Sequence, residues 1–201
     1  MDELTLLQAA RLKGRVRPAD LAATLDEDAS SVETAVKELT EAGLLVEGKT
    51  VRLSPEGRAR LNELLTDERH GLDGAAFAQA YENFRGVNRD FKALVSDWQL
   101  KDGEPNDHGD TDYDAAVLRR LDAVHQAVLP ILAAAAEQLP RLDAYAAKLS
   151  AALDRVQAGD STWLTRPTID SYHTVWFELH EELIGAAGLT RDDEAKAGDA
   201  E

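Results

Sequence analysis

The first 70 residues alternate stretches of helical apolar spacing with turn residues. Leucines at helical spacing predict an opening helix that ends at Gly14. Pro18 suits the first turn of a second helix, Pro18–Leu25, because its missing N–H has no partner there. A third helix is predicted to begin at Ser30, which fits a capping box with Glu33. Three short helices are therefore expected in succession.

Two short apolar runs follow, at 44–46 and 50–53, around the turn Glu47-Gly48-Lys49. This pattern predicts a tight hairpin. Ser54-Pro55 then opens a further helix that extends through Leu65. Three helices, a hairpin and a closing helix predict a winged helix-turn-helix over residues 1–70.

Longer apolar seams follow a polar stretch with two glycines, 66–74, which we interpret as a hinge. They predict a mainly α fold, with a C-terminal helical bundle of about four main helices over residues 71–190. Residues 191–201 are acidic and small and predict a disordered tail. The predicted bundle helices are 75–100, 114–129, 140–158 and 168–187, with a solvated connector at 101–112 and a kink or restart at Pro130.

The charge is spread unevenly along the chain. The 201 residues include 22 Lys and Arg against 38 Asp and Glu, a net charge of −16. Residues 1–70 hold 10 basic and 14 acidic side chains, a net of −4, and residues 71–201 hold 12 and 24, a net of −12. Because most of the negative charge lies outside the predicted winged helix, the net charge does not exclude nucleic acid as a partner.

Residue types and motifs exclude several functions. The chain has no cysteine, which removes disulfides, thiolate zinc sites and iron–sulfur clusters. It has no Gly-rich phosphate loop, nucleophile elbow or metal-binding helix motif, so we expect no enzyme activity, no cofactor and no metal. The N-terminus is unlike a signal peptide, and no apolar run approaches the ~20 residues that cross a bilayer. We therefore expect a cytoplasmic protein with no membrane partner.

Three motifs mark the core and turns of the predicted winged helix: Leu21-Ala22-x-x-Leu25, Val32-x-x-x-Val36-x-x-Leu39-x-x-x-Gly43-Leu44-Leu45 and Leu53-Ser54-Pro55-Glu56-Gly57. With them, residues 2–69 resemble the winged-helix module of MarR-type bacterial regulators. The resemblance implies binding to double-stranded operator DNA. The module begins at residue 2 and leaves no room for the N-terminal helix that such regulators use in dimerising. A homodimer is therefore expected to form through residues 75–190.

The chemistry of the third helix and its surroundings suits DNA. Outward hydroxyl and amino groups on its N-terminal half can donate to base edges or phosphates. Basic residues precede the second helix and lie in the hairpin. An alternative stays open, in which the fold has kept its core and docks a protein instead. The predicted DNA-binding residues are Ser30, Ser31, Thr34, Lys37, Arg15, Arg17, Lys49 and Arg52.

Four polar residues lie on apolar seams of the predicted bundle, where buried polar groups need partners: Asn88, His125, His173 and His180. They suit a polar layer that fixes helix register. They also suit, though less well, a pocket for a small aromatic or amphipathic effector, and least well a metal site, since the two histidines on the last helix are seven residues apart. The predicted effector-binding residues are His125, His173, Trp176, His180, Tyr172, Trp98, Trp163 and Arg166.

Together these features predict a DNA-binding transcriptional regulator. The winged helix would bind operator DNA, and the bundle would dimerise and bind an effector that changes the separation of the two recognition helices. The alternative is an adaptor or a regulatory subunit of a partner enzyme, in which a degenerate winged helix docks protein.

Overall fold

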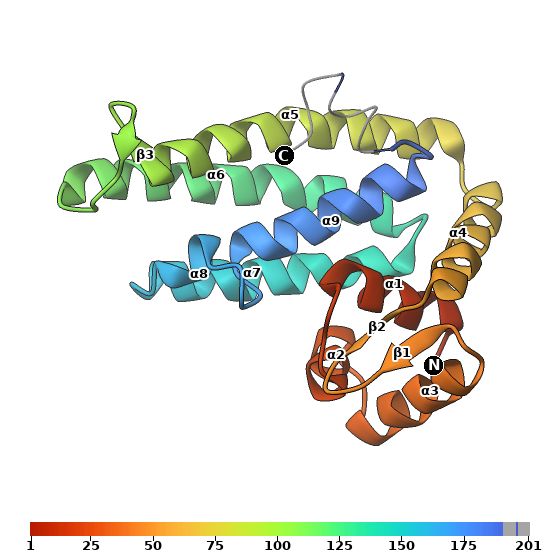
Figure 1. The fold of residues 1–201 in the computed structure, drawn as a ribbon. Helices are drawn as coiled ribbons and strands as arrows, with labels where there is room; N and C mark the ends of the chain where they lie inside the picture. Colours follow the sequence, from red (N-terminus) through yellow and green to blue (C-terminus); the bar gives the residue numbers. More distant parts are fainter. Residues whose placement is uncertain (191–195, 197–201) are drawn as a thin grey trace. The chain divides into compact units, whose positions relative to one another are not determined.

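The chain divides into two compact units: unit 1, Met1–Gly71, and unit 2, which begins at Leu72. The structure is a computed structural model that describes residues 1–190 and Lys196. The predicted tail, 191–201, lies outside the described residues apart from Lys196. The prediction of a mainly α fold is confirmed (Figure 1).

Unit 1 has four helices and one hairpin around an aliphatic core. The core consists of Leu, Val and Ala side chains, as a segment without aromatic residues requires. Helix α1 packs against α2, α4 and β2, and α2 packs against α3 (Figure 1). The elements are α1 Glu3–Lys13, α2 Pro18–Leu25, α3 Ala29–Glu41, β1 Leu45–Glu47, β2 Val51–Leu53 and α4 Pro55–His70.

The hairpin is antiparallel, with Leu45 opposite Leu53 and Glu47 opposite Val51. A third, single-residue strand joins it, because Val16 and Val51 exchange two backbone hydrogen bonds of 3.1 and 2.7 Å. This bridge ties the α1–α2 loop to the hairpin.

Two predicted boundaries in unit 1 are wrong. Helix α3 begins at Ala29, because the Asp28 carboxylate accepts from the Ser31 backbone N–H at 3.0 Å and takes the capping position predicted for Ser30. Helix α4 continues to His70, through the first part of the predicted hinge. That segment is polar but has neither Gly nor Pro before Gly71. Adding residues to an existing helix costs little free energy, because each added residue gains a backbone hydrogen bond.

The start of α4 explains one motif of the sequence. The Ser54 hydroxyl lies 2.7 Å from the Gly43 carbonyl and accepts from the Gly57 N–H at 2.8 Å. A side chain at Gly57 would put its Cβ 1.9 Å from the Leu44 carbonyl oxygen. Glycine is therefore required where the first turn of α4 meets the base of the hairpin.

Unit 2 is a helical bundle with an aromatic core. Helices α5 and α6 lie side by side, α7 packs on α6, and α9 packs on both α7 and α5 (Figure 1). The elements are α5 Gly74–Gln99, β3 Leu100–Lys101, β4 Glu104–Pro105, α6 Thr111–Ala136, η1 Pro140–Leu142, α7 Asp143–Gln157, α8 Thr162–Thr165 and α9 Tyr172–Ala186.

Three predictions for unit 2 need correction. Helix α6 continues through Pro130 without a restart. Pro130 has no N–H to donate to the Gln126 carbonyl four residues earlier. Both residues are exposed, so water can bond to that carbonyl instead. The predicted connector contains the small hairpin β3–β4. Helix α9 begins at Tyr172 rather than at residue 168, because the Ser171 hydroxyl caps it by accepting from the Thr174 N–H.

Candidate functional site

The predicted reading face of α3 is exposed and hollowed. Ser30, Ser31, Thr34 and Lys37 are all exposed. The first three line a hollow of about 330 Å³ together with Met1, Ala35 and Glu38. The structure therefore brings three predicted DNA-binding hydroxyl groups to one concave surface of unit 1.

The bridge between Val16 and Val51 joins two basic segments. Arg15 and Arg52 each lie next to a residue of this bridge, although 36 residues separate them in the chain. Arg15 is exposed and Arg52 half-buried, and Lys49 is exposed at the hairpin turn. The sequence indicated two separate basic clusters, and the bridge joins the backbone segments that carry them.

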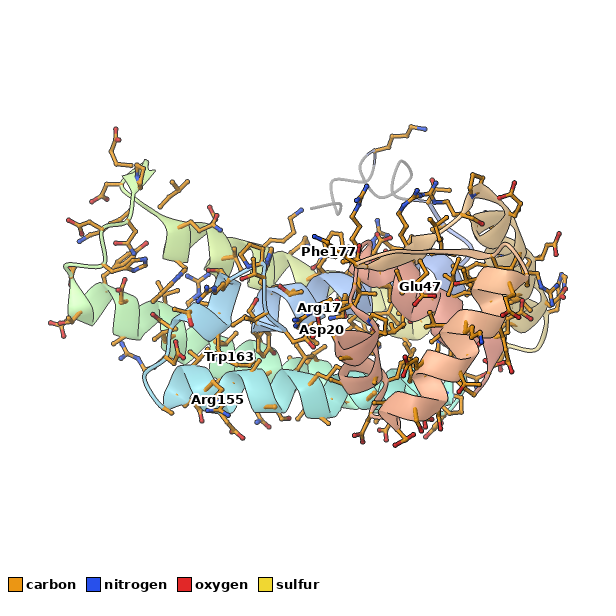
Figure 2. All side chains as sticks on the ribbon, turned by 60° about the horizontal axis from the view of Figure 1, so that its bottom comes forward. Arg17, Asp20, Glu47, Arg155, Trp163 and Phe177 are labelled. Atoms are coloured by element: carbon orange, nitrogen blue, oxygen red, sulfur yellow. The ribbon has the colours of Figure 1, made fainter. Side chains whose placement is uncertain are left out.

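Arg17 differs from the other predicted DNA contacts because a neighbour already binds it. Its guanidinium donates two hydrogen bonds to the Asp20 carboxylate, of 2.6 and 2.7 Å (Figure 2). This pairing raises the pKa of Arg17 and lowers that of Asp20. Both side chains are exposed, so a phosphate can compete with Asp20 for the guanidinium only by breaking these bonds.

Acidic residues surround the same face of unit 1. Asp26, Glu27 and Asp28 are exposed in the turn between α2 and α3. Hydrogen bonds from Ser30 and Ser31 lower the pKa of Asp28. The Asp28 carboxylate occupies the N-terminus of α3, so this helix end is not open to a phosphate.

In unit 2, the predicted effector residues on α9 are packed into the core. Tyr172, Trp176 and His180 are buried. The Trp176 ring stacks on Phe84 and Phe91, with centroid distances of 5.2 and 4.5 Å. Its indole N–H donates to the Asn88 side-chain oxygen at 2.8 Å.

His125 connects three helices through its two ring nitrogens. The Ser150 hydroxyl of α7 donates to the Ala146 carbonyl at 2.8 Å, so it accepts from His125 Nε2–H at 3.3 Å. His125 Nδ1 then accepts from the Tyr172 hydroxyl of α9 at 3.2 Å. Burial lowers the pKa of His125, against the opposing influence of Asp122 and Asp154, and raises that of Tyr172. The arrangement holds a neutral imidazole.

The other two seam histidines differ in burial. The His180 Nε2 lies 3.3 Å from the Tyr81 hydroxyl in the core. His173 was expected to be buried, but it is half-buried, with its ring 6.0 Å from Phe91. The expectation for His173 was wrong because α9 turns this position toward the edge of the apolar face.

Three predicted effector residues lie apart from this group. Trp98, at the end of α5, stacks on His108 with a centroid distance of 4.4 Å. Trp163 of α8 lies 5.7 Å from the Arg155 guanidinium (Figure 2). Arg166 is exposed and donates to the Thr168 hydroxyl at 3.2 Å. The structure therefore brings together Tyr172, Trp176, His180 and His125, but not these three.

A buried ion pair was missed by sequence reasoning. Arg141 donates to the Glu182 carboxylate at 3.0 Å, with 15% and 4% of the side chains exposed. Burial and the nearby Glu182 and Glu178 raise the pKa of Tyr145 well above its usual value. The sequence signal was present, since Glu178 and Glu182 share the helical phase of the apolar positions of α9.

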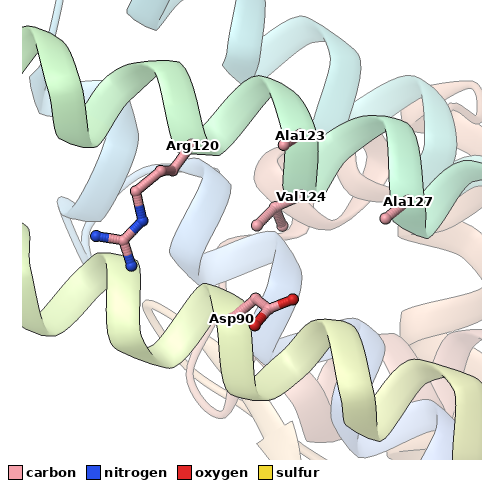
Figure 3. Close-up of a pocket in the computed structure, with 5 residues that line it drawn as sticks. All are labelled: Asp90, Arg120, Ala123, Val124 and Ala127. Atoms are coloured by element: carbon pink, nitrogen blue, oxygen red, sulfur yellow. The ribbon is translucent and has the colours of Figure 1, made fainter.

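A shallow groove lies between α5 and α6. Its volume is about 260 Å³, and Asp90 of α5 faces Arg120, Ala123, Val124 and Ala127 of α6 (Figure 3). None of these residues was predicted to bind DNA or an effector.

Neither unit contains a helix, within residues 1–190, that is long and apolar enough to cross a membrane. Comparison of the chain with protein-family models, with curated proteins and with solved structures finds no match.

Proposed function

We propose that unit 1 is a winged helix that binds double-stranded DNA, and that the protein acts as a homodimeric transcriptional regulator of the MarR type. The observation that carries the proposal is the bridge between Val16 and Val51, which joins the segment that carries Arg15 to the hairpin that carries Arg52 and Lys49. Cations on joined backbone segments can contact phosphates of one DNA backbone together.

The exposed hydroxyl groups of α3 complete the proposed interface. Ser30, Ser31 and Thr34 line the hollow. Their hydroxyl groups donate to the Asp28 carboxylate and to the Ser30 carbonyl, so they can accept from base edges, without strong preference for one base. The phosphate contacts therefore supply most of the affinity. Three such contacts per protomer are six per homodimer, which gives a salt slope of about −5.4 in a plot of log K against log salt.

The proposal is tested by fluorescence anisotropy of the full chain with a labelled duplex from its own upstream intergenic DNA. Binding should weaken steeply with salt. Arg15→Glu and Lys49→Glu should each weaken it, whereas Arg155→Glu, which makes the same charge change on α7, should not. Wild-type protein that binds no duplex at low salt, or binds with no salt dependence, would disprove DNA binding.

A second candidate function is docking to a basic protein surface. It is favoured by the exposed Asp26, Glu27 and Asp28 and by Glu33, Glu38 and Glu41 of α3, which make this side of unit 1 acidic. In this case the wild type binds no DNA, and a labelled Lys-rich peptide binds with a strength that Glu27→Gln with Asp26→Asn reduces. Binding of DNA and not of the peptide would decide against docking.

The effector prediction remains part of the proposed regulation. An aromatic effector would have to displace Trp176 or Tyr172 from the bundle core, since their rings already pack against Phe91. Any such ligand should therefore change the tryptophan fluorescence of unit 2, and Trp176→Phe should abolish that change.

A further inference from the structure

The hollow on α3 is lined by side chains that contain no nitrogen atom. They supply one thioether, one methyl group, three hydroxyl groups and one carboxylate, from Met1, Ala35, Ser30, Ser31, Thr34 and Glu38 respectively. An ionised carboxylate only accepts hydrogen bonds, whereas a hydroxyl group has one proton to donate and two lone pairs that accept. The directions of the three hydroxyl protons therefore decide whether this surface offers any side-chain donor.

The three hydroxyl protons are directed to acceptors within the chain. The Ser30 and Ser31 hydroxyl groups both donate to the Asp28 carboxylate. The Thr34 hydroxyl donates to the Ser30 carbonyl at 2.8 Å. A carboxylate and a carbonyl carry no proton, so the hydroxyl group is the donor in each contact. Only the lone pairs of the hydroxyl groups are left for a ligand in the hollow.

Glu38 carries the charge of the lining side chains. It is exposed, and its carboxylate has no ion-pair partner within residues 1–190. It follows Thr34 by one turn and Ser30 by two turns, about 12 Å along the helix axis, so the three side chains form one row. The neighbouring Lys37 does not line the hollow, and its ammonium lies 4.0 Å from the Glu41 carboxylate.

A surface that only accepts hydrogen bonds discriminates between base edges in the major groove. Guanine presents two acceptors there, O6 and N7, and a carboxylate opposite them is desolvated and repelled. Cytosine presents its N4 amino group, which can donate to the carboxylate in a charge-assisted hydrogen bond. The amino group of adenine also donates, but it lies between two acceptors, adenine N7 and thymine O4, which oppose a negative charge. Cytosine is therefore the base that Glu38 favours.

We propose that Glu38 accepts a hydrogen bond from the N4 amino group of a cytosine in the operator and is the residue of α3 that determines base preference. The hydroxyl groups of the row accept from several base edges and discriminate little, whereas a carboxylate excludes guanine by charge. A phosphate cannot take the place of the base, because both groups are anionic. This inference rests on the proposed binding of unit 1 to DNA, and it assigns the base that the surface reads.

The test selects tight binders from a library of duplexes with a randomised central segment, with the full chain as the bait. Wild-type protein should enrich cytosine at one position, and replacing that C·G pair by A·T should weaken binding by about fivefold or more. Glu38→Gln should change the preferred base at that position from cytosine to adenine, because an amide donates to N7 while it accepts from N6. The preferences at the other positions should stay as in the wild type.

The readout is the ratio of affinities for two duplexes that differ only in this base pair. Removing a negative charge strengthens binding to both duplexes, so the ratio isolates the base contact. Glu38→Ala should bring the ratio close to one. The matched control is Glu33→Gln, which removes the same charge from an exposed position of α3 outside the hollow and should leave the ratio unchanged. Circular dichroism checks that each variant is folded.

Failure of this inference is distinct from failure of the proposed function. If the wild type enriches no duplex at low salt, unit 1 does not bind DNA, and the role of Glu38 is disproved with it. If the wild type binds duplexes with salt dependence but Glu38→Gln and Glu38→Ala keep its base preferences, DNA binding stands and the role of Glu38 is overturned. A change of the same preference by Glu33→Gln, or a guanine at the position that depends on Glu38, would overturn it as well.

Discussion

Trp176 donates its indole N–H to Asn88 across 88 residues of sequence, at 2.8 Å and with both side chains fully buried. The bond joins α9 to α5 in the centre of unit 2. A polar amide among Phe84, Phe91 and Trp176 satisfies the indole N–H, so it specifies which residue of α9 lies opposite which residue of α5.

Asn88→Leu is expected to destabilise unit 2 by about 1–3 kcal/mol, because the similar-sized side chain leaves the indole N–H buried without an acceptor. Urea unfolding followed by tryptophan fluorescence measures this, since all three Trp residues lie in unit 2. The exposed Asn83→Ala is the control and should change stability by less than about 0.5 kcal/mol. Equal effects of the two substitutions would show that the buried bond contributes nothing.

The helices of unit 2 could be predicted, but their pairing could not. Asn88, His125 and Trp176 all fall on apolar seams at helical spacing, which places them in the core. The pairing of these apolar helix faces depends on contacts between residues that lie 47 to 88 positions apart in the chain. A single sequence has no periodic signal for such contacts, so it left both the register layer and the effector pocket open.

Unit 1 shows the same limit at its predicted DNA surface. Leucine spacing, Pro18 and Pro55 predicted its elements, because these signals are local. The pairing of Val16 with Val51 is one residue long and leaves no alternating pattern. The ion pair between Arg17 and Asp20 was also missed. Whether an exposed pair at this spacing forms depends on the side-chain rotamers, which the sequence does not specify.

Stability of unit 2 should fall as the pH drops below about 6.5, the usual pKa of histidine. Burial lowers the pKa of His125 in the folded protein, so the unfolded chain takes up the proton first and acid favours unfolding. The stabilisation from neutral His125 is complete above the unfolded pKa and is lost as the pH falls through the folded pKa. Urea unfolding midpoints between pH 8 and pH 5 measure this loss.

His125→Gln should flatten that pH dependence, by up to about 1.4 kcal/mol per pH unit for one proton. The exposed His70→Gln serves as the control and should leave the slope unchanged. If both variants keep the wild-type slope, His125 is not the group that titrates.

Asp20→Ala should strengthen DNA binding by about two- to fivefold, because it frees the Arg17 guanidinium and removes a negative charge near the proposed interface. Arg17→Ala alone should weaken binding less than Arg15→Ala, since Arg17 must first leave its carboxylate. Fluorescence anisotropy at two salt concentrations measures both effects.

The control for the charge change is Asp112→Ala, an exposed carboxylate of α6. Its effect on DNA affinity should be small, because Asp112 pairs with none of the proposed DNA-binding cations. An equal gain from Asp112→Ala would attribute the effect to net charge and not to Arg17.

Removing one partner of the ion pair between Arg141 and Glu182 should destabilise unit 2 strongly, whereas replacing both partners by apolar side chains should change its stability little. Arg141→Met leaves the Glu182 carboxylate buried beside Tyr145 without its cation, and should destabilise unit 2 by about 3–5 kcal/mol. Arg141→Met with Glu182→Leu removes both charges and should recover most of that loss, because a buried pair gains little net stability over apolar side chains. The exposed pair of Lys101 and Asp110 is the control, and Lys101→Met should have a much smaller effect. Tryptophan-monitored urea unfolding of the four proteins decides the matter, and a double variant less stable than Arg141→Met would show that the pair itself stabilises the fold.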